Sequence, residues 1–390
     1  FQPALWYASR MMRHASALCL VFALSGCAAD DEPAKQPTPY ALELPEGFPS
    51  PVLSAENPLT LEKIELGRWL FYDERLSGNG EQACGTCHLQ SKAFTDGLVV
   101  SEGSTGEHTP RNALALVNVA YNTTLTWANP TLKTLEAQFK VPMFGEFPIE
   151  LGLTNHEEEV LERFRQDPAM VERFKAAFPE LADPINFDRI IDAMACFVRT
   201  MISGDSPFDR YQYGLDDEAL TDSEKRGLTL FFGEKAECYH CHGGFNLSGA
   251  TTHASLAINE SSFFNNGLYN VDGKGSYPSP NQGLWTFTEK PDDMGRFRVP
   301  TLRNIEVTAP YMHDGSFETL EDVVRFYEAG GRNIETGDEA GDGRANPYKS
   351  VFVSGFELTD QEREDLIAFL KSLTDKGFLT NPAFADPNPE

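Results

Sequence analysis

The sequence is poor in positive charge. Its 390 residues contain 32 lysines and arginines against 59 aspartates and glutamates, which gives a formal net charge of −27. A surface of this sign repels nucleic-acid phosphates and attracts cations or basic protein surfaces, so a nucleic-acid-binding function is excluded. After the first thirty residues, no apolar run reaches the roughly eighteen residues that a membrane-spanning helix needs. No such helix is therefore expected there.

The composition also lacks the bias of disordered, collagen-like and coiled-coil proteins. Apolar residues make up 41%, aromatic residues 11% and charged residues 23% of the chain, which has 31 glycines and 25 prolines. These proportions are typical of a packed globular protein. At about 150 residues per domain, the length suggests two or three domains.

The first 27 residues have the pattern of an export signal. A short basic stretch at 11–14 precedes a largely apolar run at 15–24, which is too short to span a membrane. Leu24-Ser25-Gly26-Cys27 is similar to a bacterial lipobox, so we expect a lipid on Cys27; a cleaved signal without a lipid is the alternative. Residues 28–51, rich in proline, alanine and acid, are expected to form a linker. The protein is therefore expected in the periplasm, held to a membrane only through this lipid.

Two cysteine pairs are each followed directly by a histidine. The pattern C-x-x-C-H occurs twice, as Cys84, Cys87 and His88 and as Cys238, Cys241 and His242. It is the attachment signature of a c-type haem, in which two thiols bond to the vinyl groups of one porphyrin and the adjacent imidazole coordinates the iron. Two covalently bound haems c are therefore predicted.

Two other kinds of site use the same residue pattern. Pairs of this spacing also build four-thiolate zinc sites, but both pairs here end in histidine and about 150 residues separate them. A redox-active pair would need a βαβ pattern, which neither pair has. The fifth cysteine of the mature chain, Cys196, lies on an apolar helical stripe and is expected to be buried.

The segments before the two motifs repeat one another. The shared positions are Thr60, Gly67, Leu70 and Phe71 before the first motif and Thr221, Gly227, Leu230 and Phe231 before the second. Helical periodicity over 187–201 and 366–373 predicts one later helix for each half, and the glycine-rich stretches 261–297 and 330–350 are expected to be loops. We predict a mainly α fold of two cytochrome-c-like haem domains around an interdomain face, with an N-terminal domain at 52–212 and a C-terminal domain at 213–380.

From residue 57 to residue 375 the chain resembles the bacterial di-haem cytochrome c peroxidase superfamily, which includes the MauG proteins and the methanobactin-cluster MbnH enzymes. Besides the haem motifs, the resemblance rests on Pro110-Arg111-Asn112, Pro148-Ile149-Glu150-Leu151-Gly152, Val299-Pro300-Thr301-Leu302-Arg303-Asn304 and Thr308-Ala309-Pro310-Tyr311-Met312-His313-Asp314-Gly315. The family's fold, two cytochrome c domains around an interdomain face, agrees with the internal repeat.

The resemblance implies that Tyr327 is the sixth ligand of the second haem iron. In the peroxidases proper a methionine lies fourteen residues after the histidine of the His-Asp-Gly turn, and here Tyr327 lies fourteen residues after His313. MauG-type enzymes carry a tyrosine at this place. A phenolate is a hard anionic ligand that favours oxidised iron, whereas a thioether favours reduced iron. The alternative is that Tyr327 only packs in the core and Met312 or Met294 binds the iron.

The resemblance also implies that the first haem reacts with hydrogen peroxide. The family's peroxidases carry a distal histidine sixteen residues after the haem histidine, and Ser104 stands at that position; His108 is the alternative ligand. Cleavage of peroxide needs a base that moves a proton between the two oxygens. Glu150 and Gln138 are similar to the family's distal acid and amide, and Glu146 is a rival for the acid.

Two further features are implied by the family. Trp127, sixteen residues after Arg111, is similar to the tryptophan that lies between the two haems and carries electron holes between the irons. Asn112, Thr308 and Pro310 resemble its calcium ligands, and amide and carbonyl oxygens suit this hard cation. One bound calcium ion is therefore expected.

Three functions remain open from the sequence. The first is a MauG- or MbnH-like enzyme that uses hydrogen peroxide to oxidise residues, such as tryptophan, of a partner protein by long-range electron transfer; Tyr327 and Ser104 favour it. The second is a di-haem cytochrome c peroxidase that reduces hydrogen peroxide with electrons from a small redox protein. The third is an electron-transfer cytochrome without a substrate pocket, which would have two six-coordinate haems.

Overall fold

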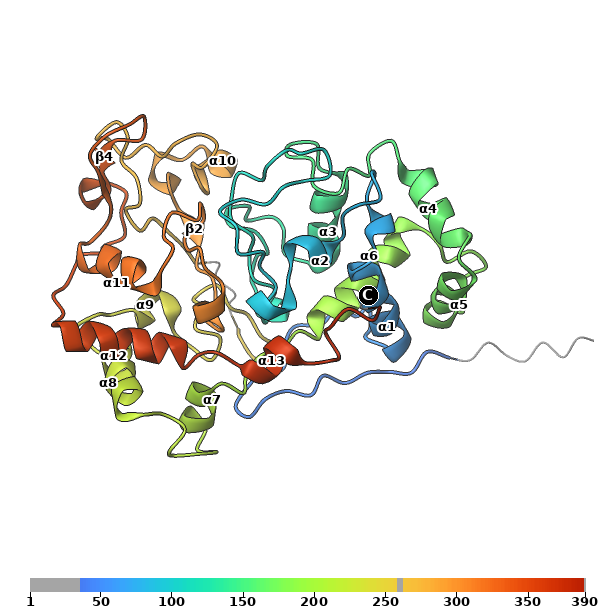
Figure 1. Cartoon of the computed structure of the whole chain (residues 1–390), viewed down its shortest axis with the longest axis horizontal. Helices are drawn as coiled ribbons and strands as arrows, with labels where there is room; N and C mark the ends of the chain where they lie inside the picture. The colour runs from blue at the N-terminus through green and yellow to red at the C-terminus, as the bar shows by residue number, and fades with distance from the viewer. Residues whose placement is uncertain (1–35, 258–261, 389–390) are drawn as a thin grey trace, which may run out of the picture. The chain divides into compact units, whose positions relative to one another are not determined.

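The computed structural model describes residues 36–257 and 262–388 (Figure 1). The predicted export signal, residues 1–27, lies outside the described residues together with Cys27. Within the described ranges the chain is mainly helical, and its strands form two antiparallel pairs with two residues in each strand. The predicted mainly α fold class is therefore confirmed. No helix in this part of the chain is long and apolar enough to cross a membrane.

The helices and strands lie in the following order. The helices are α1 (Leu61–Phe71), α2 (Cys84–Cys87), α3 (Leu135–Phe144), α4 (Glu157–Arg165), α5 (Pro168–Ala177), α6 (Phe187–Arg199), α7 (Pro207–Gln212), α8 (Asp222–Phe232), α9 (Tyr239–His242), α10 (Trp285–Thr288), α11 (Leu320–Glu328), α12 (Asp360–Lys371) and α13 (Lys376–Thr380). Strand β1 (Phe263–Phe264) pairs with β2 (Phe297–Arg298), and β3 (Asn333–Ile334) pairs with β4 (Gly341–Asp342). The short strands and helix α10 interrupt the two stretches, 261–297 and 330–350, that were predicted as loops.

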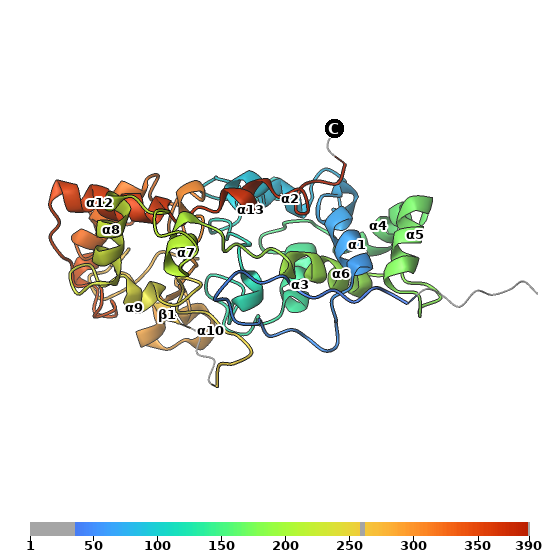
Figure 2. The same cartoon turned by 90° about the horizontal axis from the view of Figure 1, so that it is seen from below.

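Two helix pairs repeat the same packing. Helix α1 crosses α6, and helix α8 crosses α12 (Figures 1 and 2). Thr60 and Thr221 cap the starts of α1 and α8, because each hydroxyl accepts a hydrogen bond from the N–H three residues later. A β-carbon on Gly67 would overlap a backbone carbonyl of α6, and one on Gly227 would overlap a backbone carbonyl of α12. The repeat in the sequence therefore corresponds to a repeated helix pair with a glycine at each crossing.

We expect the Gly227→Ala variant to be less stable than the wild type. A β-carbon at this position would overlap the carbonyl oxygen of Asp365, so α8 must move away from α12. Such overpacking typically costs about 1–3 kcal/mol, and it opposes the roughly 1 kcal/mol by which alanine is the better helix former. Thermal unfolding of the haem-loaded protein measures the loss.

The matched control is Thr229→Ala, an exposed position in the same helix. Its stability should stay within about 0.5 kcal/mol of the wild type, as is usual for surface substitutions. If Gly227→Ala lost no more stability than this control, α8 and α12 could accommodate the β-carbon without strain.

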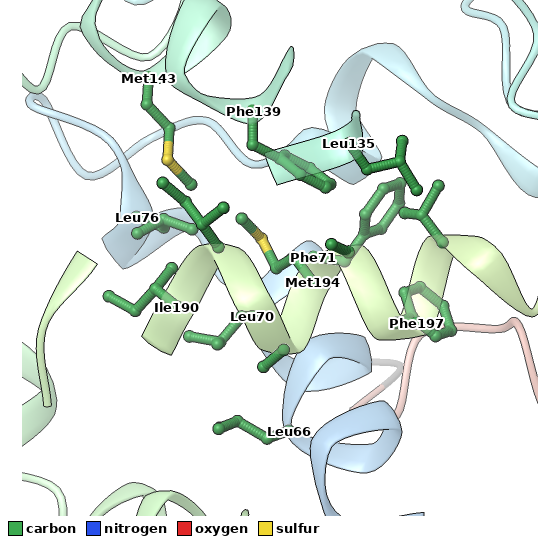
Figure 3. Close-up of a cluster of buried hydrophobic side chains, with 14 of the residues drawn as sticks. Leu66, Leu70, Phe71, Leu76, Leu135, Phe139, Met143, Ile190, Met194 and Phe197 are labelled. Carbon is green, nitrogen blue, oxygen red and sulfur yellow. The ribbon is translucent and has the colours of Figure 1, made fainter. Parts of the chain in front are cut away.

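The first hydrophobic core surrounds α6. Figure 3 shows that this helix packs against α1 on one side and α3 on the other, with side chains that include Leu66, Leu70, Phe71, Leu135, Phe139, Met143, Ile190, Met194 and Phe197. Cys196 is also fully buried in α6. Residues 193–199 of α6 are all buried, so this half of the helix lies inside the protein, between α1 and α3. Cys84 of the first haem motif packs against the edge of this core.

Two further clusters accompany the second motif. One is built on α8, α11 and α12 and includes Phe231, Leu320, Val324, Leu366, Phe369 and Leu370. The other lies among the long loops and consists of Ala128, Leu268, Tyr269, Tyr277, Phe297 and Phe326, with Trp127 and Tyr327 packed against it. The predicted candidates Trp127 and Tyr327 therefore share one apolar cluster.

Both ends of the described chain pack onto the protein body. After α12 the chain returns to the first core, where Phe378 and Phe384 are buried and the Gln90 amide donates to the carbonyl oxygen of Phe378. The described part of the predicted linker, residues 36–51, places Phe48 in edge contact with other aromatic rings, and Phe48 is 8% exposed. The division into two haem domains at residue 212 stays a prediction, and the contacts of α13 with the first core cross it.

Candidate haem sites

The first cysteine pair lies in the single helical turn α2. The Ala83 N–H donates to the Thr86 hydroxyl, which closes the start of the turn, and His88 follows its end. The Nδ1 atom of His88 lies 2.6 Å from the carbonyl oxygen of Phe94, so Nδ1 carries the proton and Nε2 is free to coordinate. Burial lowers the pKa of His88 and keeps the ring neutral, which is the state that binds metals.

The second cysteine pair, in and beside α9, has the same arrangement. The Nδ1 atom of His242 lies 3.2 Å from the carbonyl oxygen of Leu247, and burial lowers the pKa of this histidine to about 4. Burial also raises the pKa values of the thiols, to about 12 for Cys84 and Cys238 and about 11 for Cys87 and Cys241. Each motif presents two neutral thiols and one free imidazole nitrogen, a donor set that fits covalent attachment and axial coordination of a haem c.

The described residues do not bring the two cysteine pairs together. They contain no group of three or more histidine, cysteine, aspartate or glutamate side chains that could hold a metal ion. A zinc site with four thiolates would need such a group. The alternative use of the cysteines as one zinc site is therefore not supported.

A cavity of about 1700 Å³, including its open mouth, lies against the second motif. Its walls include Cys238, Cys241 and His242 of the motif together with Tyr327, Met312 and Trp127. Its lining is mostly apolar and includes the two thiols and the imidazole of the motif, a set of groups that fits a haem c. The structure thus brings the second motif, Tyr327 and Trp127 to one cavity.

Both candidates for the sixth ligand line this cavity. Tyr327 lies in the last turn of α11, and burial raises the pKa of its phenol above the ordinary value of 10.0. Asn266 contacts both side chains: its amide forms a hydrogen bond with the phenol of Tyr327, and its Nδ2 lies 3.5 Å from the sulfur of Met312. Met294 belongs to the neighbouring cluster but is not part of the cavity wall.

Arg298, which is not among the residues predicted from the sequence, also lines the cavity. Its side chain is 3% exposed, its Nε donates to the carbonyl oxygen of Thr126, and burial lowers its pKa to about 10. A buried guanidinium favours an anionic neighbour, and the propionates of a haem are anionic. The signal in the sequence was a single arginine between the apolar residues Phe297 and Val299.

The two predicted distal residues lie on α3 and on the segment beside it. The N–H of Leu151 donates to the carbonyl oxygen of Pro142 in α3, which fixes the Glu150 segment along the helix that carries Gln138. Besides burial, the negative charge of Glu150 raises the pKa values of both thiols of the first motif, Cys84 and Cys87.

Both distal side chains have polar atoms shielded from water. Burial raises the pKa of Glu150 above the ordinary value of 4.5, and the Oε1 atom of Gln138 is buried without a hydrogen-bond partner among the described atoms. The rival acid, Glu146, is exposed. A half-buried acid with a raised pKa and an unpaired amide oxygen are features of a binding site rather than of a surface.

The alternative ligand for the first iron lies at the surface. His108 is exposed and pairs with Glu102 in an isolated β-bridge. Ser104 is closer to the distal residues, because its N–H donates to the carbonyl oxygen of Glu150 over 2.7 Å. In this structure the serine, not the histidine, therefore lies beside the predicted distal acid.

Trp127 and the three predicted calcium ligands line the same large cavity. The indole N–H of Trp127 donates to the carbonyl oxygen of Asn112 over 2.8 Å, and its ring centroid lies 6.5 Å from that of His313. Asn112, Thr308 and Pro310 all line the cavity with Trp127. The hydrogen bond from the N–H of Asn112 to the carbonyl oxygen of His313 joins the segment of Asn112 to the segment that carries Thr308 and Pro310.

Known proteins with a similar sequence are di-haem oxidoreductases. A family model described as di-haem cytochrome c peroxidase matches residues 61–217. A cytochrome-c peroxidase of Pseudomonas sp. (strain SCT) is 35% identical over 379 residues, which cover 92% of this chain and 90% of the relative. The methylamine utilization protein MauG of Methylorubrum extorquens is 33% identical over 355 residues, with 90% of this chain and 89% of the relative covered.

Solved structures agree with these relatives. The crystal structure of a MauG-like protein associated with microbial copper homeostasis superposes with a TM-score of 0.87 at 51% identity, and the match covers 89% of this chain and 99% of that chain. The di-haem peroxidase BthA of Burkholderia thailandensis has the same fold, with a TM-score of 0.63 at 22% identity over 89% of this chain and 97% of that chain. The chain therefore belongs to the di-haem cytochrome c peroxidase family, which includes MauG, and is a haem-dependent oxidoreductase.

Proposed function

We propose that this protein is a MauG-like, peroxide-dependent enzyme that oxidises residues of a partner protein, such as tryptophan, by long-range electron transfer. The main support is the position of Tyr327, which lines the cavity at the second haem motif. Peroxidases proper have a methionine at this place. The 51% identity to a MauG-like protein associated with copper homeostasis supports the same branch and suggests a partner in copper handling.

The two haems supply, when bound, the iron that accepts the oxidising equivalents of hydrogen peroxide. In this proposal Cys84, Cys87 and His88 hold the first haem and Cys238, Cys241, His242 and Tyr327 hold the second. Glu150 accepts and returns a proton of the peroxide, Gln138 orients the peroxide through its unpaired amide oxygen, and Trp127 carries electrons between the two sites.

Residues 52–212 and 213–380 form the two cytochrome-c-like haem domains, and one calcium ion binds to Asn112, Thr308 and Pro310 where their segments meet. The family is typically periplasmic, and attachment through a lipid on Cys27 would keep the enzyme at a membrane.

Spectroscopy with peroxide tests the proposed function. We would record optical and electron paramagnetic resonance spectra of the oxidised, haem-loaded protein before and after one equivalent of hydrogen peroxide. We expect one high-spin and one low-spin iron, and both signals should change after peroxide is added. Two low-spin irons that do not react with peroxide would indicate an electron-transfer cytochrome instead.

The relatives named cytochrome-c peroxidase favour a second candidate function, reduction of peroxide with electrons from a small redox protein. The two functions differ in the fate of the electrons. Multiple turnovers with a reduced small cytochrome would support the peroxidase. Peroxide-dependent oxidation of tryptophan in the product of a neighbouring gene, detected by peptide mass spectrometry, would support the MauG-like enzyme.

The Glu150→Gln variant should react more slowly with peroxide. General acid–base groups contribute about 10²–10⁴-fold to a rate, and stopped-flow absorbance of the haem-loaded protein measures the loss. Burial raises the pKa of Glu150. When the pH is lowered, the wild-type rate should therefore begin to fall at a higher pH than it would with an ordinary glutamate. Below the raised pKa the carboxyl is protonated and can no longer accept the proton, so Glu150→Gln should lose this acidic limb.

Glu146→Gln is the matched control, since Glu146 is an exposed acid four residues earlier. It should keep both the rate and the pH profile. If Glu146→Gln were the slow variant and Glu150→Gln reacted normally, the assignment of the distal acid would be wrong.

A further inference from the structure

A line of aromatic rings leads away from the cavity at the second haem motif. Trp127 and His313 line that cavity, and their ring centroids are 6.5 Å apart. The ring of Tyr277 lies 6.4 Å from His313, and the ring of Tyr269 lies 5.4 Å from Tyr277. Electrons tunnel readily between aromatic rings at such separations, so an oxidised tryptophan can draw an electron from either tyrosine.

The hydrogen-bond partners of these rings determine which ring can form a stable radical. A phenol that loses an electron becomes a strong acid and must release its proton. The hydroxyl of Tyr269 donates to the carboxylate of Asp314 over 2.6 Å, the length of a charge-assisted hydrogen bond. The hydroxyl of Tyr277 donates to the amide oxygen of Asn265 over 2.9 Å, and the indole of Trp127 donates to a backbone carbonyl. An amide oxygen is too weak a base to hold this proton, whereas a carboxylate, with an ordinary pKa of about 3.9, is basic enough to take it from an oxidised phenol.

The burial of Tyr269 determines what such an oxidation could do. The side chain is 5% exposed and the guanidinium of Arg332 lies 5.7 Å from its ring centroid. A partner protein therefore cannot reach the ring directly. An oxidising equivalent on Tyr269 is stored inside the protein and can return through Tyr277 and Trp127.

We propose that Tyr269 is a redox-active tyrosine that stores an oxidising equivalent when no partner protein is present, with Asp314 as its proton acceptor. Tyr269 loses one electron, which passes through Tyr277 and Trp127 to the peroxide-oxidised protein, and its phenolic proton moves to Asp314. The products are a neutral tyrosyl radical and a neutral carboxylic acid. Hydrogen peroxide is the oxidant: one molecule accepts two electrons and two protons from solution to give two water molecules, which balances the oxidation of Tyr269 in two protein molecules. The inference rests on the peroxide-driven oxidation proposed above.

Electron paramagnetic resonance of freeze-quenched samples tests the proposal. The haem-loaded protein would be mixed with one equivalent of hydrogen peroxide without any partner, and the optical spectrum of the haems would be followed in parallel. The wild type should show a tyrosyl radical that narrows when ring-deuterated tyrosine is incorporated. Tyr269→Phe should lose this radical and keep the optical response of the haems. Tyr211→Phe, in α7 and outside the aromatic line, is the matched control and should keep both.

The role of the carboxylate has its own readout. Asp314→Asn keeps the size and a hydrogen bond to Tyr269 but cannot accept the proton, so the radical should be lost while Tyr269 is still present. In the wild type, the proton on Asp314 should appear as an exchangeable coupling to the radical in electron–nuclear double resonance, which needs no variant. An unchanged radical in Tyr269→Phe, or a radical without this coupling, would overturn the inference. Haems that do not respond to peroxide in the wild type would instead overturn the proposed function.

Discussion

The Tyr327→Phe variant is expected to lose partner-protein oxidation while both haems stay attached. Phenylalanine keeps the ring that packs against Phe326 but removes the hydroxyl that bonds to Asn266, which also lines the cavity. Removal of a residue that only supports a metal ligand typically lowers activity about 10–100-fold. Removal of the ligand itself should lower the activity further. Peptide mass spectrometry of the partner measures the oxidation, and the pyridine haemochrome spectrum measures the haem content.

Met312→Leu is the matched control for this variant, because Met312 lines the same cavity and contacts the same Asn266 side chain. If Tyr327 binds the iron, Met312→Leu should keep the low-spin signal of the second haem and Tyr327→Phe should lose it. The opposite result would identify Met312 as the ligand of the second haem iron. It would favour a peroxidase that takes electrons from a small redox protein. The pair of variants therefore separates the two leading functions with one spectrum each.

The parts of the fold that depend on short stretches of sequence were predictable. Thr221 and Glu224 form a capping box at the start of α8, and the same arrangement of Thr359 and Glu362 begins α12. These signals need only residues three positions apart, and apolar periodicity marked α6 in the same way. The C-x-x-C-H motifs are equally local, because the spacing of the vinyl groups fixes the spacing of the thiols.

Long-range contacts carried the information that the sequence did not show. Tyr269 meets Asp314 across 45 residues, and Arg298 reaches the carbonyl of Thr126 across 172 residues. No periodicity or motif predicts which loops face each other, since the long glycine-rich stretches have no repeating pattern. The choice between Tyr327 and Met312 stayed open for the same reason: both residues line the cavity, and only a measurement with the haem present decides between them.

The Arg303→Met variant is expected to unfold at a markedly lower temperature than the wild type. Arg303 and Asp209 are each 1% exposed and form two parallel hydrogen bonds of 2.8 and 2.9 Å. The guanidinium also donates to the carbonyl oxygen of Phe245 and lies 4.7 Å from the ring centroid of Phe48. Methionine leaves the buried carboxylate of Asp209 without its cation, and breaking a buried pair in this way typically costs about 3–5 kcal/mol. Calorimetry of the haem-loaded protein measures the loss.

A neighbouring pair of the same chemistry provides the control. Arg210 and Asp205 also form two hydrogen bonds, both of 2.7 Å, but their side chains are 50% and 61% exposed. Because water screens exposed pairs, which are worth about 0–1 kcal/mol, Arg210→Met should change the stability little. Equal losses in the two arginine variants would mean that burial does not determine the strength of the Arg303 pair.

A double variant separates the uncompensated charge from the lost packing. In Arg303→Met with Asp209→Leu no charge is left in the site, and replacing a whole buried ion pair by apolar residues is often neutral or stabilising. The double variant should therefore be more stable than Arg303→Met alone, although the leucine cannot accept the hydrogen bonds that Ser206 donates to Asp209. If the double variant were the less stable of the two, the packing of Arg303 on Phe48, rather than its charge, would be the main contribution. In that case Arg303→Lys, which keeps the charge but not the planar group, should be as unstable as Arg303→Met.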